Sequence, residues 1–503
     1  LSEFWRRIEG SPRSPLSLKL SQVVASRLNL IPLYFNKQGN KDIYIYRSKI
    51  IGHFLEVRGL KLAETGQKTS SARKRIKVGF LNAHFTSQTE TYTTIPTFSH
   101  LDRSKFEVVL YCLGSSGGPL ENFCRNCADA FVVLPQALDE QIKKIRGDRL
   151  DALVIGTNVT AVTNQAALLA SARLAPVQLI NNSSPVTSGM PHVDGYLSGT
   201  FLVDEMSGEE YSEKLCLLDG PSHCFNYEVD RREPVVKLDR AGLGIPQDAV
   251  VYFSGANCFK IIPEMQEAWA RILAKVPGSV LLLHPFNPNW ASKYPVHRFE
   301  RNMLAAFARH GVEASRLVLS RGRLPSRSDV LELIKLSDIY IDSFPFAGVN
   351  SAVDPLEVGI PLVACEMQTF RSRMAGSLLR ELKIKELIAS DEQEYIDLAV
   401  NLGLDSTYRA EVSQKILSAM GQNPRFLDSA AYSANMGRII ESLVGRSAPE
   451  KTIKKGDGTI QYAIDEFNSG RLSEAEDICR DLLAKDEKCA GAWALMGRMA
   501  LLN

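Results

Sequence analysis

The chain has 503 residues, of which 45% are hydrophobic and 23% are charged, and its formal net charge at pH 7 is +2. This length predicts about three domains, and the composition is typical of a soluble globular protein. The near-zero net charge argues against a dedicated nucleic-acid-binding protein, and no apolar run reaches the roughly 18 residues that a membrane span needs.

The first half of the chain predicts a helical region followed by an α/β domain. Residues 1–74 are expected to be mostly helical and to end in a polar linker, Glu64–Lys74. From Ile76 onwards, apolar runs of strand length alternate with helical stretches such as Leu138–Ile145 and Thr163–Ala172. The expected strands are Ile76–Leu81, Phe106–Cys112, Phe131–Leu134, Ala152–Ile155 and Val177–Ile180. This alternation predicts a doubly wound parallel sheet over residues 75–235.

The same alternation starts again after a turn at Leu243–Gln247 and predicts a second α/β domain, residues 236–445. Its expected strands are Val250–Phe253, Val280–His284, Arg316–Ser320, Asp338–Asp342 and Ile360–Ala364. Its expected helices are Met265–Lys275, Arg301–Arg309 and Ser328–Lys335, followed by a helix-rich region from Ser372 to Val444. Two successive units of this kind predict a cleft between them.

One stretch of the second domain has the pattern of an anion-binding site. A strand ends at Asp342, a loop rich in Pro and Gly follows, and Ser351 with Asp354 has the S-x-x-D spacing of a capping box, which predicts a helix from Ser351 to Gly359. The free N–H groups and the dipole of a helix N-terminus favour a phosphate, and ligands of open α/β sheets bind at the carboxyl ends of strands. The alternative interpretation is an ordinary βαβ unit with a well-capped helix.

The end of the chain has a different pattern. After a polar linker at Arg446–Gly458, small and aromatic residues follow the spacing of a tetratricopeptide repeat, about 34 residues. The matching positions are Tyr462, Ala463, Gly470, Ala475, Leu482, Trp493, Gly497 and Ala500. We therefore predict a helical repeat segment, residues 456–503.

The nine cysteines are scattered and odd in number, which favours a reducing cytoplasm over a disulfide framework. Cys124 and Cys127 form an isolated C-x-x-C motif. A zinc or redox site needs a complete ligand set, so we interpret these two cysteines as core thiols.

Several longer motifs occur in one order along residues 75–405. They are Tyr211–Leu215 after a block rich in Asn, Ser and Gly (Ile180–Gly199), Asn257–Pro263 with Trp269–Leu273, Lys275–Leu281, Asp342–Asp354, Gly359–Pro361, Ser372–Ser377, Glu386–Ala389 and Gln393–Gly403. Together they make the chain similar to the protein O-linked N-acetylglucosamine transferases and their SPINDLY relatives, and we identify it as resembling a bacterial protein glycosyltransferase of that family. In that family the repeats usually precede the catalytic region, whereas here the visible repeat follows it.

The resemblance implies a GT-B fold, with a nucleotide sugar bound between two Rossmann-like domains, and an inverting glycosyltransferase that uses no metal and no other cofactor. Without a metal, a Lys or Arg and helix N–H groups must stabilise the charge on the leaving diphosphate. Lys260, in one motif with Asn257, aligns with the phosphate-binding lysine of the family. A surface lysine is the alternative.

Three further residues have both a functional and an ordinary interpretation. Arg327 aligns with a basic residue that the family places near the ribose, although a solvated basic loop with Arg321 and Arg323 is the alternative. Asp354 aligns with the acidic residue at the sugar end of the site, and its alternative role is the helix cap. His284 ends a strand that faces the cleft, where it is expected to bind donor or acceptor or else to be structural.

The sequence departs from the family at two places. Val349–Ala352 replaces a His-Thr-Thr-Gly run, so Asn350 and Ser351 stand at the expected helix start and the identity of the donor is open. In the first domain the general base is also open. His84, Glu90 and Asp151 are all expected to follow strands that face the cleft, and each is a candidate for accepting the acceptor's proton. Asp151 and Glu90 rank together, ahead of His84.

The sequence therefore predicts a cytoplasmic glycosyltransferase that transfers a sugar from a nucleotide sugar, UDP-GlcNAc or another UDP-hexose, to a protein side chain. The repeat is expected to contact the protein acceptor. One alternative is a GT-B transferase that acts on a glycan or a lipid carrier. Another is a non-catalytic scaffold that recruits proteins through its repeat.

Overall fold

The computed structural model describes residues 1–64, 74–204, 207–286, 294–322, 324–445, 463, 467, 472–485 and 489–500. Residues 1–444 and 445–503 form two separate units, each with its own contacts. Among the described residues no helix is both long and apolar enough to cross a membrane. All nine cysteines are described and free, and Cys124 is buried, as expected of a core thiol.

The chain begins with helices that pack on the first α/β domain. They are α1 (Ser2–Gly10), α2 (Pro15–Arg27), the 3₁₀ helix η1 (Ile31–Phe35) and α3 (Lys41–Val57). Helix α2 starts at Pro15, whose missing N–H costs nothing at this position, and the Ser14 hydroxyl accepts a hydrogen bond from the backbone N–H of Ser17. The buried face of α3 includes Ile50, Ile51 and Leu55. The prediction of a helical N-terminal region is confirmed.

The first sheet has seven parallel strands in the order β3-β2-β1-β4-β5-β6-β7. Their bounds are β1 Ile76–Asn82, β2 Phe106–Cys112, β3 Ala130–Val133, β4 Ala152–Ile155, β5 Val177–Ile180, β6 Gly195–Gly199 and β7 Lys214–Leu218. The first five match the sequence prediction. The prediction missed β6 and β7. Glycine at both ends of β6 and a charged first residue in β7 conceal the apolar run that identifies a buried strand.

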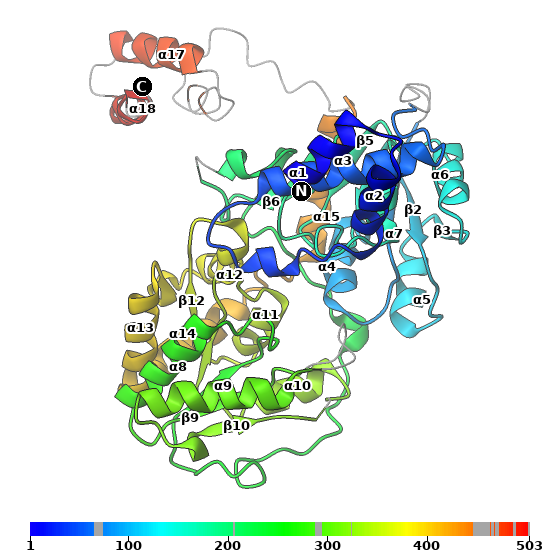
Figure 1. Ribbon diagram of the computed structural model, residues 1–503. Helices are drawn as coiled ribbons and strands as arrows, with labels where there is room; N and C mark the ends of the chain where they lie inside the picture. The colour runs from blue at the N-terminus through cyan, green and yellow to red at the C-terminus, as the bar shows by residue number, and fades with distance from the viewer. Residues whose placement is uncertain are drawn as a thin grey trace. The chain divides into compact units, whose positions relative to one another are not determined.

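The second sheet has six parallel strands in the order β10-β9-β8-β11-β12-β13. Their bounds are β8 Val251–Ser254, β9 Val280–Leu283, β10 Leu317–Leu319, β11 Ile339–Ile341, β12 Leu362–Cys365 and β13 Ile388–Ala389. Figure 1 shows that the two sheets, each with its own helices, lie in different halves of the unit formed by residues 1–444. The central strands of both sheets are buried on both faces, as in doubly wound domains, so the GT-B prediction of two Rossmann-like domains is confirmed.

Helices connect the strands of both sheets. In the first domain they are α4 (Thr89–Phe98), α5 (Pro119–Asn126), α6 (Leu138–Gly147) and α7 (Gln165–Ala170). In the second they are α8 (Pro263–Lys275), α9 (Val296–Arg309), α10 (Arg327–Ile334), α11 (Asn350–Glu357), α12 (Met374–Glu381), α13 (Glu392–Leu404) and α14 (Ser406–Met420). The last helix of this unit, α15 (Ser429–Leu443), returns to the first domain and packs beside α4 (Figure 1).

The return of α15 is fixed by hydrogen bonds. Ser433 Oγ donates to the carbonyl of Pro96 at 2.6 Å, and Tyr432 OH donates to the carbonyl of Ser222 at 2.8 Å. The chain therefore passes between the domains twice, once after β7 and once before α15. This double connection limits how the two domains can move relative to each other.

The second unit contains two described helices, α17 (Leu472–Lys485) and α18 (Ala490–Ala500), which pack against each other. Small residues fill the contact between them, among them Ala475, Cys479 and Ala492. Tyr462 and Gly470, like the linker at 446–458, lie outside the described residues. Helical structure is confirmed for residues 472–485 and 490–500, and the tetratricopeptide assignment stays a prediction.

A buried arginine attaches the N-terminal region to the second domain. Arg371 is 2% exposed and donates hydrogen bonds to the backbone carbonyls of Tyr34 at 2.6 Å, Gln38 at 3.1 Å, and Asn36. Because the guanidinium is buried and always charged, it needs several acceptors, and here backbone carbonyls supply them. The hydrogen bonds of one side chain thus attach three residues of the 34–38 segment to the second domain.

We expect Arg371→Met to lower the free energy of unfolding by about 3 kcal/mol, since it leaves three carbonyls without their donor. Thermal unfolding measures this loss, and limited proteolysis should show new cleavage near residues 34–38. Arg271→Met is the matched control, because Arg271 pairs with Glu392 at the surface, with 34% and 36% of the two side chains exposed. That control should cost less than about 1 kcal/mol. Equal melting temperatures for the two variants would contradict this role of Arg371.

Candidate functional site

Polar residues from several strands meet at the carboxyl edge of the second sheet. Lys260 lies in the loop after β8, His284 follows β9, and Asp342 follows β11. The carboxyl ends of parallel strands share one edge of a sheet. The loop from Asp342 to Val349, which we call the 342–349 loop, leads from this edge into α11.

Hydrogen bonds hold the 342–349 loop in one conformation. Both carboxylate oxygens of Asp342 accept from the backbone N–H of Gly348 at 3.0 Å. Ser343 Oγ donates to the carbonyl of Phe346 at 2.8 Å, and Tyr395 OH donates to the carbonyl of Asp342 at 2.8 Å. The loop is therefore built around the buried carboxylate of Asp342, which is 1% exposed.

Lys260 extends over this loop. Its Nζ donates to the carbonyl of Ala347 at 2.9 Å and lies 3.8 Å from the ring centroid of Phe346, a cation–π contact. Burial lowers the pKa of Lys260 to about 8, against the opposing charge of Asp342. Burial raises the pKa of Asp342 to about 6, against the opposing charge of Lys260. At pH 7 both groups are therefore mainly ionised.

Helix α11 begins one residue earlier than the sequence predicts, and it has no side-chain cap. It starts at Asn350. The capping position is occupied by Val349, whose side chain has no hydrogen-bond acceptor for the N–H groups of the helix N-terminus. The expected capping box of Ser351 and Asp354 is wrong because the Asp354 carboxylate turns to Arg327 instead. In the part of the chain that the structure describes, no side chain caps the first N–H groups of α11, which favours an anionic ligand there.

Arg327 lies in a buried ion-pair network, so the alternative of a solvated basic loop is wrong. Its side chain is 10% exposed, its Nε donates to Asp354 Oδ1 at 2.8 Å, and its guanidinium also pairs with Glu357. Its Cζ lies 3.8 Å from the ring centroid of Tyr227. Two carboxylates and one aromatic face fix Arg327, and burial raises the pKa of Asp354 while Arg327 lowers it.

His284 and Asn257 both lie on the same edge of the sheet. The Nδ1 of His284 is 3.1 Å from Ser320 Oγ, whereas the buried Nε2 has no hydrogen-bond partner among the described residues. Burial lowers the pKa of His284, which keeps the imidazole neutral near pH 7. Asn257 Nδ2 donates to Tyr294 OH at 3.0 Å, and the Tyr294 ring packs against Phe259 and Phe286.

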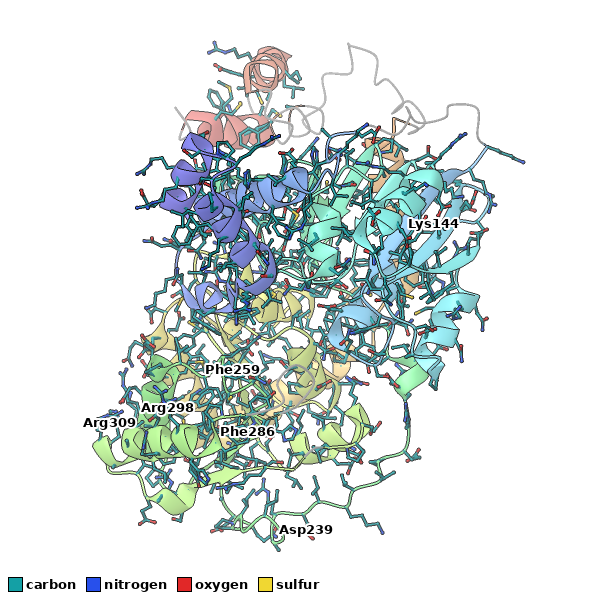
Figure 2. The ribbon with its side chains drawn as sticks, turned by 45° about the vertical axis from the view of Figure 1, so that its right-hand side comes forward. Lys144, Asp239, Phe259, Phe286, Arg298 and Arg309 are labelled. Carbon is teal, nitrogen blue, oxygen red and sulfur yellow. The ribbon has the colours of Figure 1, made fainter. Side chains whose placement is uncertain are left out.

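Figure 2 shows Phe259 and Phe286 close together at this place in the second domain. Phe259 is 39% exposed, next in sequence to Lys260. An exposed aromatic ring beside a cation provides a flat apolar surface at the edge of the site.

At the first domain, Glu90 and His84 lie where the sequence predicts, after the first strand and near its carboxyl end. Glu90 Oε1 accepts from the backbone N–H of Asn158, in the loop after β4, at 3.1 Å. Burial raises the pKa of Glu90. The Nδ1 of His84 is 2.9 Å from Gln88 Nε2 and 3.1 Å from Thr86 Oγ1, so local hydrogen bonds orient its ring.

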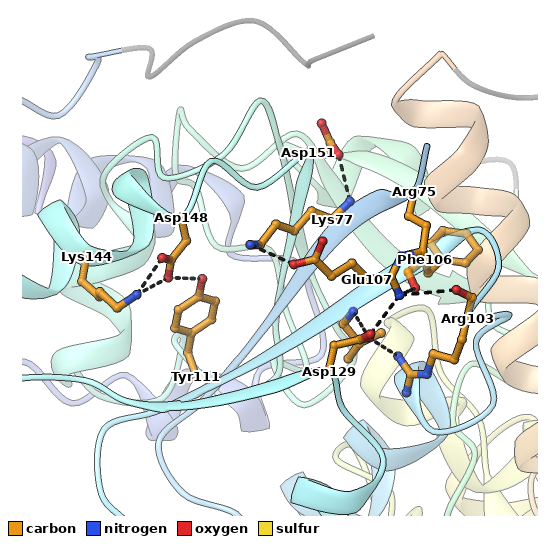
Figure 3. Close-up of polar contacts among 11 residues, drawn as sticks. Arg75, Lys77, Arg103, Phe106, Glu107, Tyr111, Asp129, Lys144, Asp148 and Asp151 are labelled. Carbon is orange, nitrogen blue, oxygen red and sulfur yellow. Dashed lines mark hydrogen bonds and ion pairs between the residues drawn. The ribbon is translucent and has the colours of Figure 1, made fainter. Parts of the chain in front are cut away.

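The expectation that Asp151 follows a strand facing the cleft is wrong. Asp151 precedes β4, at the amino end of the strand, and its Oδ2 accepts from the backbone N–H of Lys77 at 2.8 Å (Figure 3). Its side chain thereby extends the pairing of β1 with β4 at the edge of the sheet away from Glu90. The residue order agrees with this position, because Asp151 precedes the expected strand Ala152–Ile155 and ligands of parallel sheets bind at the carboxyl ends.

The sequence did not single out Tyr34 and Tyr227, which also reach the site. Tyr34 OH lies 2.7 Å from Thr160 Oγ1 in the first domain, and its ring lies 5.4 Å from that of Phe346. Tyr227 OH donates to Asn350 Oδ1 at 2.7 Å. Both tyrosines come from connecting segments, where no periodic pattern marks a functional position. Among the described residues, no group of three His, Cys, Asp or Glu side chains could hold a metal ion.

Comparison with known proteins supports the resemblance drawn from the motifs. Residues 222–436 match the model of glycosyl transferase family 41. The SPINDLY protein of Petunia hybrida is 24% identical over 380 residues, which cover 74% of this chain and 39% of that protein. The UDP-N-acetylglucosamine–peptide N-acetylglucosaminyltransferase of Caenorhabditis elegans is 29% identical over 212 residues, 42% of this chain and 17% of that protein. The chain thus spans less than half the length of these relatives.

Among solved structures, a mutant of the Thermobaculum terrenum O-GlcNAc transferase matches with a TM-score of 0.66 at 21% identity, covering 89% of this chain and 81% of that chain. This likeness shows a shared fold. Together with the two parallel sheets it confirms the GT-B architecture. The motif order and the family model confirm that the chain resembles the O-GlcNAc transferase and SPINDLY glycosyltransferases.

The 342–349 loop depends on a glycine at position 348, which yields a direct test. A Cβ there would lie 2.7 Å from Asp342 Oδ1 and 2.5 Å from Ser351 Oγ. The serine can rotate, but the carboxylate is held by the N–H of Gly348 itself. We expect Gly348→Ala to cost about 1–3 kcal/mol of unfolding free energy.

Gly114→Ala is the control, because nothing lies within 4 Å of its Cβ position. It should be neutral or slightly stabilising, since alanine restricts the unfolded chain. Thermal melting of both variants measures the difference. An unchanged melting temperature for Gly348→Ala would show that the loop is not constrained in this way.

Proposed function

We propose that the protein is an inverting glycosyltransferase that moves a sugar from a UDP-sugar, with UDP-N-acetylglucosamine the first candidate, to a protein side chain. The observation that carries the proposal is the position of Lys260 on the loop that leads into an uncapped helix N-terminus, at the carboxyl edge of a Rossmann-like sheet. This edge lies inside the segment that matches glycosyl transferase family 41. Relatives named for UDP-N-acetylglucosamine and a peptide acceptor support the choice of donor and acceptor.

In the proposed reaction an acceptor oxygen or nitrogen attacks the anomeric carbon, and the bond from that carbon to the outer phosphate breaks. Negative charge builds on the diphosphate as it leaves. Lys260, held in place by Ala347 and Phe346, and the first N–H groups of α11 would stabilise this charge without reorganising. No metal and no other cofactor enters the proposed mechanism.

A base must remove the proton of the acceptor, and the first domain offers Glu90 and His84. We rank Glu90 first, because burial raises its pKa towards the range in which a carboxylate is an effective base near neutral pH. His84 remains the second candidate. Asp151 is no longer one, since it binds the backbone at the other edge of the sheet.

We place the protein in the cytoplasm, which the free cysteines support. We propose a protein acceptor, with the helices of the second unit contributing contacts to it. A transferase for a glycan or lipid carrier and a non-catalytic scaffold are the alternatives. A scaffold would have no need to retain a partly buried ammonium beside Asp342.

The first test measures release of UDP from a panel of nucleotide sugars by the full chain. We expect hydrolysis or transfer with a UDP-sugar, and we expect Lys260→Met to reduce turnover by about a hundredfold to a thousandfold, the cost of losing one preorganised charge. Met fills the space of the lysine stem, so the fold should survive. Normal turnover by this variant would contradict the role of Lys260, and inactivity of the wild type with every nucleotide sugar would contradict the proposed function.

The second test uses a chelator. If the ammonium of Lys260 and the helix N-terminus together stabilise the diphosphate, excess EDTA should leave the rate of UDP release within about twofold of its original value. Lys260→Met serves as the comparison, because added Mg²⁺ or Mn²⁺ should not restore its activity. Loss of wild-type activity with EDTA and recovery with a divalent cation would show that the reaction depends on a metal.

A further inference from the structure

The side chain of Asn350 is held with its two ends facing different surroundings. Its Oδ1 accepts a hydrogen bond from Tyr227 OH at 2.7 Å. A primary amide has an acceptor oxygen on one side and a nitrogen with two N–H donors on the other. Because the tyrosine occupies the oxygen, Nδ2 carries the unused hydrogen-bonding capacity, and among the described residues it has no acceptor. Asn350 as a whole is half-buried, so its side chain is not enclosed in the core.

The amide stands at the first turn of α11, directly after the loop that carries Lys260's acceptor, Ala347. Two other kinds of hydrogen-bond donor belong to this region, the first backbone N–H groups of α11 and the ammonium of Lys260 over the loop. The amide oxygen would be the exception if it faced the same way. The hydrogen bond from Tyr227 prevents that orientation.

Tyr227 can enforce the orientation because its own ring cannot move easily. The residue is 4% exposed. Its ring meets that of Tyr92 edge-on at a centroid distance of 5.1 Å and stacks on that of Phe225 at 5.8 Å. The guanidinium of Arg327 covers the ring at 3.8 Å. These contacts come from both domains, so the position of the hydroxyl depends on how the two domains are packed together.

We propose that Tyr227 is a positioning residue that orients the amide of Asn350 so that Nδ2 donates to the diphosphate of the bound nucleotide sugar. This inference rests on the proposed function and adds to it a residue from the connection between the domains. Without the hydroxyl, the amide can rotate by half a turn at almost no steric cost. It would then present Oδ1 to the phosphate oxygens and repel them.

The test compares binding of UDP and of uridine to the full chain by calorimetry. Tyr227→Phe keeps the ring contacts with Tyr92, Phe225 and Arg327 and removes only the hydroxyl. We expect the Kd for UDP to rise about threefold to tenfold, the range for one hydrogen bond. We expect the Kd for uridine, which has no phosphate, and the melting temperature to stay as in the wild type.

The matched control is Tyr92→Phe. It removes a buried hydroxyl that donates to Asp230, from a ring in contact with Tyr227, and leaves the amide of Asn350 alone. Its UDP affinity should remain within about twofold of the wild type. A general loosening of the aromatic cluster would weaken UDP binding in both variants, whereas the loss of amide orientation weakens it only in Tyr227→Phe.

A second pair of variants tests the amide itself. Asn350→Asp keeps an oxygen for Tyr227 and replaces Nδ2 by a negative oxygen, so it should weaken UDP binding more than Asn350→Ala does. An acidic residue suits the first turn of a helix, so the aspartate variant should not melt lower than the alanine variant. This ordering would not arise if Asn350 were only structural.

The outcomes distinguish the positioning role of Tyr227 from the proposed function. If wild-type protein binds UDP and Tyr227→Phe binds it equally well, the positioning role is wrong while the proposed function stands. The role is also wrong if Tyr227→Phe loses affinity for uridine as much as for UDP, or if Asn350→Asp binds UDP better than Asn350→Ala. If wild-type protein binds no UDP, the proposed function fails and this inference fails with it.

Discussion

The organisation of the site follows from one partly buried charge, the ammonium of Lys260. A cation removed from water needs an opposing charge and hydrogen-bond acceptors, and the 342–349 loop supplies both through Asp342 and the carbonyl of Ala347. The carboxylate of Asp342 in turn needs a hydrogen-bond donor. The N–H of Gly348 is that donor, and it reaches the carboxylate only because the loop is tightly folded. The loop directs the chain into α11 with its N-terminus uncapped. Charge compensation and the geometry of the anion site thus have the same cause.

This arrangement lowers stability in return for a preorganised site. The pKa of Asp342 is raised to about 6, so between its ordinary value and about 6 the folded state binds more protons than the unfolded state, and stability falls as pH rises through that range. The pKa of Lys260 is lowered to about 8, so between about 8 and its ordinary value the unfolded state binds more protons, and stability rises with pH there. Near pH 7 both ionised groups disfavour folding by their burial, and a bound diphosphate would compensate the lysine.

Distant segments of the chain support this small region from several sides. Residues 34–38 are fixed by Arg371, and the ring of Tyr34 lies against that of Phe346, which itself lies under Lys260. From the connection between the domains, Tyr227 contacts both Asn350 and Arg327. The position of α11 therefore depends on the N-terminal helices and on the packing of both domains, although the helices it packs against, α10, α12 and α14, all belong to the second domain. The second domain alone would lack the contacts that Tyr34 and Tyr227 make with it.

The sequence by itself determined the alternation of strands and helices, the two-domain fold and the importance of Lys260, because apolar runs and motif order are local properties of the chain. It located the start of α11 to within one residue, but it left Asp354 open between a helix cap and the sugar end of the site, whereas in the structure this carboxylate pairs with Arg327. The prediction also placed Asp151 at the wrong end of β4, and it gave no sign of Tyr227. The order of residues alone places Asp151 before β4, at its amino end, whereas only the tertiary structure decided the partners of Asp354 and Tyr227. A carboxylate binds whichever donor or cation folding brings nearest, and residues far apart in sequence become partners only once both sheets and the connection between them have packed.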